Sequence, residues 1–305
     1  GLQKPIHIQK SFVRKNLKIT VHQCFNEHDK LLHLLYLLQK HHDQTGIIYV
    51  LTRKDAHAYA QLLNRLRPGE AEIAVYHGGL DKEIRQRIQK GFIDESIKII
   101  IATNAFGLGI DQPHVRFVIH AQISSNLENY FQEIGRAGRD GNLSDCYTLF
   151  TKKDLEISAQ FIAGNSSADK TQLKILRFKL QQIIKYLETK QCRQKFILNY
   201  FDEKTPLDFA CQLCDHCRHM ELAYSDKVKT KFAHWQTWRN NYARTKNLIS
   251  SSVITNLSLA YLSIVDWRQF KDLALIPGIG AGAKKILTRF LETNQDLADL
   301  THLNL

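Results

Sequence analysis

The stretch IKIIIATNAFGLGIDQPHVRFVIH, residues 97–120, contains two apolar runs, IKIIIAT and VRFVIH, on either side of a glycine-containing loop. Both runs are rich in isoleucine and valine and lack a regular polar face, which is typical of strands buried in a parallel sheet. Further runs of this kind occur in the first half of the chain: KITVHQC, GIIYVLT, AEIAVYH and CYTLF. Amphipathic segments separate them, as at residues 80–92. The alternation predicts an α/β domain, a parallel sheet wrapped by helices, over residues 1–162.

Composition limits the classes of function. The chain has 305 residues, enough for two or three domains, and its 42 Lys and Arg against 30 Asp and Glu give a net charge of +12. This charge favours a polyanionic partner, nucleic acid first. No apolar stretch approaches the roughly 18–20 residues of a membrane span, and no signal sequence opens the chain, so we expect a soluble intracellular protein without a membrane partner. The single methionine, Met220, and the initial Gly1 favour a fragment of a longer protein.

The residues that follow the predicted strands are candidates for ligand binding, because ligands of open parallel sheets lie at the carboxyl ends of the strands. The loops at this edge carry hydroxyl, imidazole, guanidinium and carboxylate groups, and their glycines would let a ligand approach the backbone closely. The candidates are Thr52, Arg53, His77, Thr103, Gly107, Gly109 and Asp111. Each loop taken alone is consistent with an ordinary turn, whereas several such loops at one edge favour a binding site.

Three further motifs join the 97–120 stretch: GIIYVLTR at 46–53, YHGGL at 76–80 and YFQEIGRAGRDG at 130–141. In order and spacing these motifs resemble the second motor domain of RecQ-like superfamily 2 helicases. The resemblance covers roughly residues 11–160. It implies a RecA-like fold for the predicted sheet domain and single-stranded DNA contacts at Thr52, Arg53, His77 and Thr103.

The glycine-rich motif gives the resemblance its chemistry. In such helicases two RecA-like domains close on ATP, and this motif supplies arginines to the γ-phosphate. The resemblance implies Gln132 and Arg136 as positioning residues and Arg139 as the arginine finger. A planar, permanently charged guanidinium suits the task, because it stabilises charge that develops on a transferring phosphate. The alternative is a surface turn in which both arginines pair with Glu133 and Asp140.

The nucleotide site is incomplete in this sequence. The resemblance implies ATP contacts at Gly109, Asp111 and the two motif arginines, but no phosphate-binding loop of the pattern G-x-x-x-x-G-K-[ST] occurs, and GIGAGAKK at 278–285 does not fit it. We therefore expect half of a motor, which binds ATP and Mg²⁺ only together with a first motor domain and is inactive alone as an ATPase. Gln112 departs from the family pattern, since many relatives have lysine there.

Four cysteines predict a metal site. Cys192, Cys211, Cys214 and Cys217 have the spacing C-x18-C-x2-C-x2-C, which can gather four thiolates around one Zn²⁺ ion. His216 is a rival ligand. The segment 165–201, whose sequence predicts helices, and the cysteine-rich loop that follows resemble the zinc-binding subdomain of RecQ-like helicases. We assign residues 163–222 to this subdomain. The remaining cysteines, Cys24 and Cys146, stand in apolar runs and are expected to be buried core thiols.

The tail, residues 223–305, resembles the small all-α HRDC domain at the end of many RecQ-like proteins. Lys284 and Lys285 follow the IPGIG turn and would bind a DNA phosphate together with its amides. A solvated basic helix is the alternative. The family commonly has a winged-helix domain between the zinc site and HRDC, whereas here only some ten residues separate the two. Separation of the DNA strands would therefore need another structural element.

Two functions of different class remain. The first is the C-terminal part of an ATP-dependent 3′–5′ DNA helicase that acts on single-stranded and junction-containing DNA. The second is a zinc-stabilised DNA-binding module without catalysis. Arg136 and Arg139 favour the helicase, because a pure binding module needs no γ-phosphate sensor. The helicase would lie in the cytoplasm with the nucleoid in a bacterium, or in the nucleus otherwise.

Overall fold

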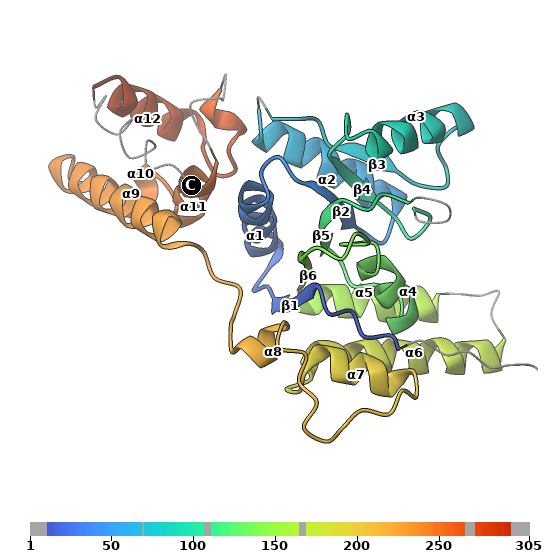
Figure 1. The fold of residues 1–305 in the computed structure, drawn as a ribbon. Helices are drawn as coiled ribbons and strands as arrows, with labels where there is room; N and C mark the ends of the chain where they lie inside the picture. Colours follow the sequence, from blue (N-terminus) through green and yellow to red (C-terminus); the bar gives the residue numbers. More distant parts are fainter. Residues whose placement is uncertain (1–10, 69, 107–110, 165–168, 266–271, 294–305) are drawn as a thin grey trace, which may run out of the picture.

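The computed structural model describes residues 11–68, 70–106, 111–164, 169–265 and 272–293 (Figure 1). A six-stranded sheet lies at the centre, with the strand order β1-β6-β5-β2-β4-β3 and parallel pairing throughout. The strands are β1 (Leu17–Gln23), β2 (Thr45–Tyr49), β3 (Ala74–Tyr76), β4 (Ile99–Ala102), β5 (Val115–His120) and β6 (Ser144–Phe150). All positions of β2 and β4 are buried, which confirms the parallel sheet predicted from their apolar runs.

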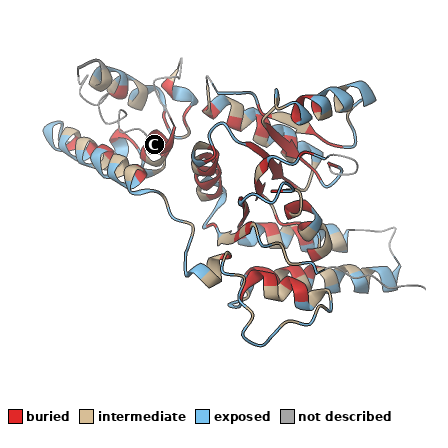
Figure 2. Cartoon of the chain, viewed as in Figure 1, coloured by how far each residue is buried: buried red, intermediate tan, exposed pale blue. Residues whose placement is uncertain are grey.

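Five helices accompany the sheet: α1 (Glu27–Lys40), α2 (Arg53–Leu66), α3 (Lys82–Ile93), α4 (Leu127–Ile134) and α5 (Lys152–Ala163). The amphipathic segment predicted at 80–92 forms α3, with Ile88 and Phe92 buried. The leucines of α1 and the inner side of α2 share one apolar cluster with one face of the sheet, and α3 and α4 share a second cluster with the opposite face. Figure 2 shows these buried positions between the helices and the strands.

The zinc-binding segment continues the core of the sheet domain. Its helices are α6 (Lys170–Glu188), α7 (Arg193–Tyr200) and α8 (Asp215–Arg218). Asp169 begins α6 with a reciprocal capping box to Gln172. Tyr186 of α6 is fully buried and donates its hydroxyl to that of Tyr130 on α4 at 3.0 Å. The apolar core therefore continues from the sheet domain into α6 and α7.

The last segment is helical, as predicted: α9 (Asp226–Thr245), α10 (Ser250–Val253), α11 (Asn256–Ile264), the 3-10 turn η2 (Leu273–Leu275) and α12 (Ala281–Thr293). Helix α11 contacts α1, and the two share one apolar cluster (Figure 1). Leu35 and Leu38 of α1 face Ile264 and Val265 across a small cavity. Among the described residues, no helix combines the length and the apolar character that crossing a membrane requires.

Candidate functional site

The turn at residues 135–139, here called the arginine turn, directly follows α4. Gly138 has φ of +58°, and a Cβ atom there would overlap the side chain of Asn16 and the carbonyl of Asn142. The amide of Gly138 donates to the carbonyl of Val115 at 2.9 Å, which ties the turn to the start of β5. Only glycine tolerates both the left-handed conformation and this close packing, so the sequence GRAGR fixes the turn locally.

Two side chains from the segment before β1 hold the arginine turn in place. The guanidinium of Arg14 donates to the carbonyls of Gly135 and Ala137, at 2.9 and 2.8 Å. The side-chain amide of Asn16 donates to the carbonyl of Gly138 at 2.7 Å. Burial lowers the pKa of Arg14, and the carbonyl dipoles offset part of the cost of burying its charge. Sequence analysis missed both residues. No local signal marks Arg14, because 121 positions separate it from Gly135.

The three predicted catalytic side chains lie together. Gln132, Arg136 and Arg139 line one open pocket of about 390 Å³, together with Phe12 and Arg14. Gln132 and Arg139 are exposed, and Arg136 is half-buried. The structure thus presents an amide and two guanidinium groups to a common space over a fixed backbone, an arrangement suited to an anionic ligand.

The predicted acidic neighbours have partners of their own. Arg139 donates to the carboxylate of Asp111 at 2.7 Å, and 84% of the Asp111 side chain is exposed. Asp140 accepts two hydrogen bonds of 2.8 Å from Arg116, which lower its pKa to about 2. A surface pair such as Arg139–Asp111 contributes little stability, so a phosphate can displace the carboxylate at small cost.

Glu133 anchors the helix that carries the arginine turn. This buried carboxylate accepts a hydrogen bond from Ser124 and lies 2.8 Å from Nε2 of His120, at the end of β5. The ring of Tyr49 stacks on His120, and burial raises the pKa of the Tyr49 hydroxyl, which also lies beside Arg136. The network fixes α4 to the carboxyl edge of the sheet, so the motif arginines face that edge.

The loop after β4 is described only in part. Gly107 and Gly109, predicted to contact nucleotide, lie outside the described residues. Gln112, the departure from the family's lysine, is buried and donates its side-chain amide to the carbonyls of Phe92 and Ile93, at 2.8 and 3.1 Å. Gln112 therefore caps the carboxyl end of α3, which explains why an amide suits this position.

The predicted DNA contacts follow three neighbouring strands, β2, β4 and β3, at one edge of the sheet. Thr52 is the N-cap of α2 and its hydroxyl is bonded to Asp55. Thr103 and His77 are each only 6% exposed. Arg53 is exposed, and its guanidinium lies over Gly79, where a Cβ atom would overlap it. Of the four candidates, Arg53 is therefore the side chain best placed to meet a phosphate.

The imidazole of His77 is committed to contacts within the protein. Its Nε2 lies 2.9 Å from Nε2 of His57, and its Nδ1 accepts a hydrogen bond from the amide of Gly79. Burial, with His57 and Arg53 nearby, lowers the pKa of His77 and favours the neutral ring. The ring is therefore suited to hold the loop, and a DNA contact through it would first require His57 to move.

The two predicted lysines of the tail differ. Lys284 forms an ion pair of 3.0 Å with Asp272, whereas Lys285 is exposed. Gly278 of the preceding turn has φ of +80°, and a Cβ atom there would overlap Ser258. The turn is therefore fixed, but the charge of Lys284 is balanced within the tail. This balance favours the solvated basic helix over a phosphate site.

The four predicted cysteine ligands converge. The sulfur atoms of Cys192, Cys211, Cys214 and Cys217 all lie within 4.8 Å of one another. Those of Cys211 and Cys217 are 3.8 Å apart, which matches the edge of a tetrahedron with zinc–sulfur bonds of about 2.3 Å. Cys192 precedes α7 as its N-cap, one position earlier than the predicted place on the helix. All six cysteines are free thiols, and Cys24 and Cys146 are buried, as predicted.

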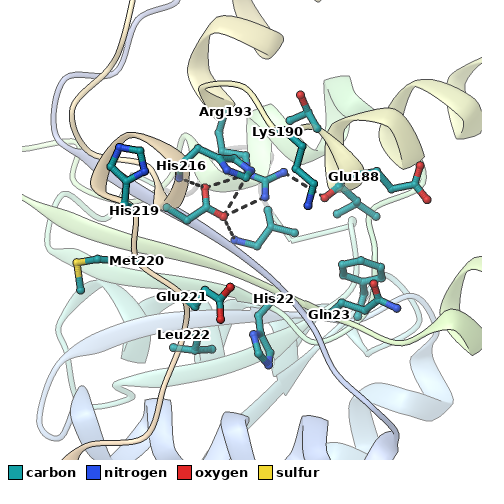
Figure 3. Close-up of a pocket in the computed structure, with 15 residues that line it drawn as sticks. His22, Gln23, Glu188, Lys190, Arg193, His216, His219, Met220, Glu221 and Leu222 are labelled. Carbon is teal, nitrogen blue, oxygen red and sulfur yellow. Dashed lines mark hydrogen bonds and ion pairs between the residues drawn. The ribbon is translucent and has the colours of Figure 1, made fainter.

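Backbone amides point at the cysteine cluster. The amides of Cys211, Cys214 and Arg193 donate to the sulfur atoms of Cys192, Cys211 and Cys214, at 3.3 to 3.4 Å. Such bonds stabilise thiolates, the form that binds zinc. His216, the rival ligand, lies outside the four-sulfur group. It lines the neighbouring pocket instead (Figure 3).

An ion pair that sequence analysis did not find fastens the cluster to the motor domain. Arg193 is buried and donates to the carboxylate of Asp215 at 3.0 Å, and also to the carbonyl of Tyr186 at 2.6 Å. The same carboxylate accepts a hydrogen bond of 3.0 Å from the amide of Val21 in β1. Asp215 thus joins the cysteine loop, α6 and the sheet. Its neighbour Cys214 was the only signal available in the sequence.

Comparison with known proteins gives two family matches. The helicase conserved C-terminal domain matches residues 28–141, and the RecQ zinc-binding domain matches residues 152–218. The chain therefore contains a helicase C-terminal domain and a RecQ-type zinc-binding domain. The helicase match contains the arginine turn with Arg53, His77 and Thr103, and the RecQ zinc-binding match contains all four cysteines of the cluster.

Similar proteins come from several kinds of organism. The ATP-dependent DNA helicase RecQ of Bacillus subtilis is 37% identical over 72% of this chain and 37% of its own length. A putative ATP-dependent RNA helicase, R290, of Acanthamoeba polyphaga mimivirus is 39% identical over 69% of this chain and 37% of its own length. The ATP-dependent helicase SGS1 of Saccharomyces cerevisiae is 35% identical over 72% of this chain and 15% of its own length.

The RecQ relatives are thus considerably longer than the region they share with this chain. Both family matches end at or before residue 218, so they leave the tail outside. The HRDC resemblance of the tail, the predicted domain boundaries and the individual roles of the site residues stay predictions.

Proposed function

We propose that the chain supplies the C-terminal motor half of an ATP-dependent 3′–5′ DNA helicase. Arg139 is the arginine finger, and Gln132 and Arg136 position the nucleotide beside it. The observation that carries this proposal is the shared pocket of these three side chains above a turn whose backbone is fixed by Arg14. A preorganised guanidinium stabilises developing phosphate charge without reorganisation at the moment of reaction.

ATP and Mg²⁺ would be held mainly by a first motor domain that faces this pocket. Asp111 would keep Arg139 oriented between turnovers and release it to the γ-phosphate, because the exposed pair is weak. Asp111 would then stand beside the nucleotide, as the family resemblance implies. Gly109 would stand in the same loop.

Zinc would be structural in this protein. The cysteine cluster offers four thiolates at tetrahedral separations, and four protein ligands leave no open position for water or substrate. Bound zinc would supply no hydrolytic chemistry. It would offset the mutual repulsion of four closely placed thiolates and hold the cysteine loop against α7.

DNA would bind along the edge formed by β2, β4 and β3, with Arg53 as the leading contact. Its exposure and the net charge of +12 support a mode that follows the phosphate backbone. Affinity should be nearly independent of base sequence, for single strands and for the single-stranded parts of junctions. The protein would act on the nucleoid of a bacterium or in a eukaryotic nucleus.

Fluorescence anisotropy with a labelled single-stranded DNA tests this interface. We expect the logarithm of the affinity to fall steeply with the logarithm of salt concentration. Arg53→Ala should weaken binding several-fold and reduce that slope by about one unit. Arg65→Ala is the matched control, because Arg65 is an exposed arginine in the last turn of the same helix.

The outcomes separate the candidate ligands. Equal affinity for a single-stranded RNA of the same sequence would favour an RNA helicase, the activity for which the mimivirus relative is named. A flat salt response, or equal losses in both arginine variants, would contradict a phosphate contact at Arg53. The binding-module alternative predicts the same DNA binding but no effect of Arg139 on ATP turnover.

A further inference from the structure

A second group of metal-ligating side chains lies away from the cysteine cluster. His22, Cys24 and Asp29 each place one ligand atom within 4.8 Å of the other two. They lie where β1 ends and α1 begins, in the sequence HQCFNEHDKLLH. This ending of β1 carries none of the groups assigned above to nucleotide, DNA or zinc.

The local backbone explains the convergence. His22 and Cys24 are two positions apart on an extended chain, so their side chains share one side. The amide of Cys24 is held by the carbonyl of Phe150 at 2.7 Å. Asp29 lies in the first turn of α1, where one carboxylate oxygen accepts a hydrogen bond of 2.8 Å from the amide of Phe25. The second oxygen of Asp29 remains available for a ligand.

His33 adds a fourth donor. It stands four residues after Asp29 on α1, on the same helix face, and its Nε2 lies 3.5 Å from the second carboxylate oxygen. The rings of His33 and His22 have centroids 4.3 Å apart. His33 is 5% exposed, and its Nδ1 has no hydrogen-bond partner among the described residues.

We propose that His22, Cys24, Asp29 and His33 bind one divalent metal ion of zinc-like preference. Two imidazoles, one thiolate and one carboxylate form a ligand set that suits tetrahedral Zn²⁺. Donor atoms around such an ion are about 3.3–3.8 Å apart, so the ligand atoms of His22, Cys24 and Asp29 must approach one another by about an ångström. His33 lies outside this group of three and must move further. Side-chain rotation supplies this contraction, since the backbones of Cys24 and Asp29 are already held.

The surroundings provide an entrance and a cover. His22 lines a polar pocket of about 700 Å³ that also exposes Glu221, and Figure 3 shows both side chains at its wall. An ion can therefore reach His22 from solvent. On the far side of His33, the ring of Tyr224 stacks at a centroid distance of 4.5 Å. Tyr224 belongs to the link between α8 and α9, so an ion here would fasten that link to α1.

Zinc stoichiometry tests the proposal. The chain is purified under reducing conditions, incubated with Zn²⁺ alone and freed of excess metal by gel filtration. We expect two zinc ions per wild-type chain, one in Cys24→Ala and one in His22→Ala. Cys146→Ala is the matched control, because Cys146 is also a buried thiol, and it should keep two. His22 is only partly buried, so His22→Ala keeps the test valid if the Cys24 variant fails to fold.

Cobalt gives a second measurement. With the cysteine cluster filled by Zn²⁺, added Co²⁺ should produce a charge-transfer band of a single thiolate, and Cys24→Ala should abolish it. One zinc ion per wild-type chain would overturn the proposal. Two zinc ions in Cys24→Ala would overturn it as well. Neither result bears on the arginine turn or on the DNA-binding edge, so failure here leaves the proposed helicase function untouched.

Discussion

The arginine turn and the cysteine cluster are built in opposite ways. In the turn, partly buried polar groups hold the backbone and the functional side chains face outwards: Arg14 and Asn16 bind its carbonyls, whereas Arg139 is exposed. In the cluster the functional side chains face inwards and hold the backbone, with Cys214 fully buried. Outward groups can meet a ligand, and inward groups maintain the fold. Substitutions in the two regions should therefore separate catalysis from stability.

The largest effect is expected from Arg139→Ala, measured in a protein that joins this chain to a phosphate-loop domain. The rate of ATP turnover should fall by about 10³–10⁵-fold, because the finger acts in the transition state. Nucleotide affinity and the thermal midpoint should change little, since Arg139 is exposed and its pair with Asp111 is weak. Steady-state kinetics, nucleotide titration and thermal melting measure the three quantities.

Arg116→Ala is the control for this variant, because Arg116 pairs with Asp140 nearby but does not line the pocket. Equal losses of nucleotide binding and turnover would make Arg139 a ground-state contact. Unchanged turnover would favour the non-catalytic binding module.

The next effect is expected from Cys214→Ser, and it should appear in folding before chemistry. Structural zinc in small domains contributes on the order of 10 kcal/mol to folding, and loss of one thiolate removes much of it. The cluster shares its apolar core with α6 and the sheet, so loss of metal should also loosen α6. We expect less zinc per chain by metal analysis, lower solubility and a lower thermal midpoint.

Cys146→Ser controls for the change of a buried thiol to a hydroxyl. Its zinc content should equal that of the wild type. Retention of full zinc by Cys214→Ser, or a Cys192–Cys211 disulfide in the purified chain, would contradict the metal assignment.

The sequence predicted those features whose causes are local. Apolar runs predicted the sheet, and the cysteine spacing predicted the cluster, because each pattern determines its own geometry. Contacts between distant segments left no such pattern. Lys30 lies in a helix with charged neighbours and would be expected in solvent, yet it is fully buried against Asp154 at 2.7 Å. Arg14 and the pair Arg193–Asp215 were not predicted, for the same reason. The hydroxyl of Thr52 caps α2, and this role competes with its predicted contact to DNA.

Arg14→Ala should have an intermediate effect that connects the two regions, because Arg14 is an inward group that serves an outward one. Loss of its charged hydrogen bonds to the carbonyls of the arginine turn should lower the free energy of unfolding by about 2–3 kcal/mol, measured by urea denaturation. Arg14→Lys should recover little, since an ammonium cannot reproduce the fork of the guanidinium. Lys15→Ala, an exposed neighbour, should be neutral. If both Arg14 variants match the wild type, the turn is held by Gly138 and Asn16 alone.

The smallest effects are expected from pH, and here an inward and an outward group should titrate in different windows. The folded-state pKa of His33, which faces His22, Asp29 and Tyr224, is lowered from 6.5 to about 4 by burial and by His22. The unfolded chain therefore binds a proton between these values while the folded chain does not, so His33 contributes full stability above pH 6.5 and loses it as the pH falls towards 4.

Asp140, exposed and bonded to Arg116, has its pKa lowered from 3.8 to about 2, so its contribution is lost only below pH 3.8. The measurement is the difference in unfolding free energy between the wild type and His33→Gln, both prepared without added Zn²⁺ so that the site proposed at His22 is empty and acid release of zinc from the cysteine cluster cancels. That difference should change between pH 6.5 and 4 and be flat above, whereas His28→Gln, at an exposed position of the same helix, should follow the wild type throughout. A difference that is flat across this window would show that His33 is not an inward group.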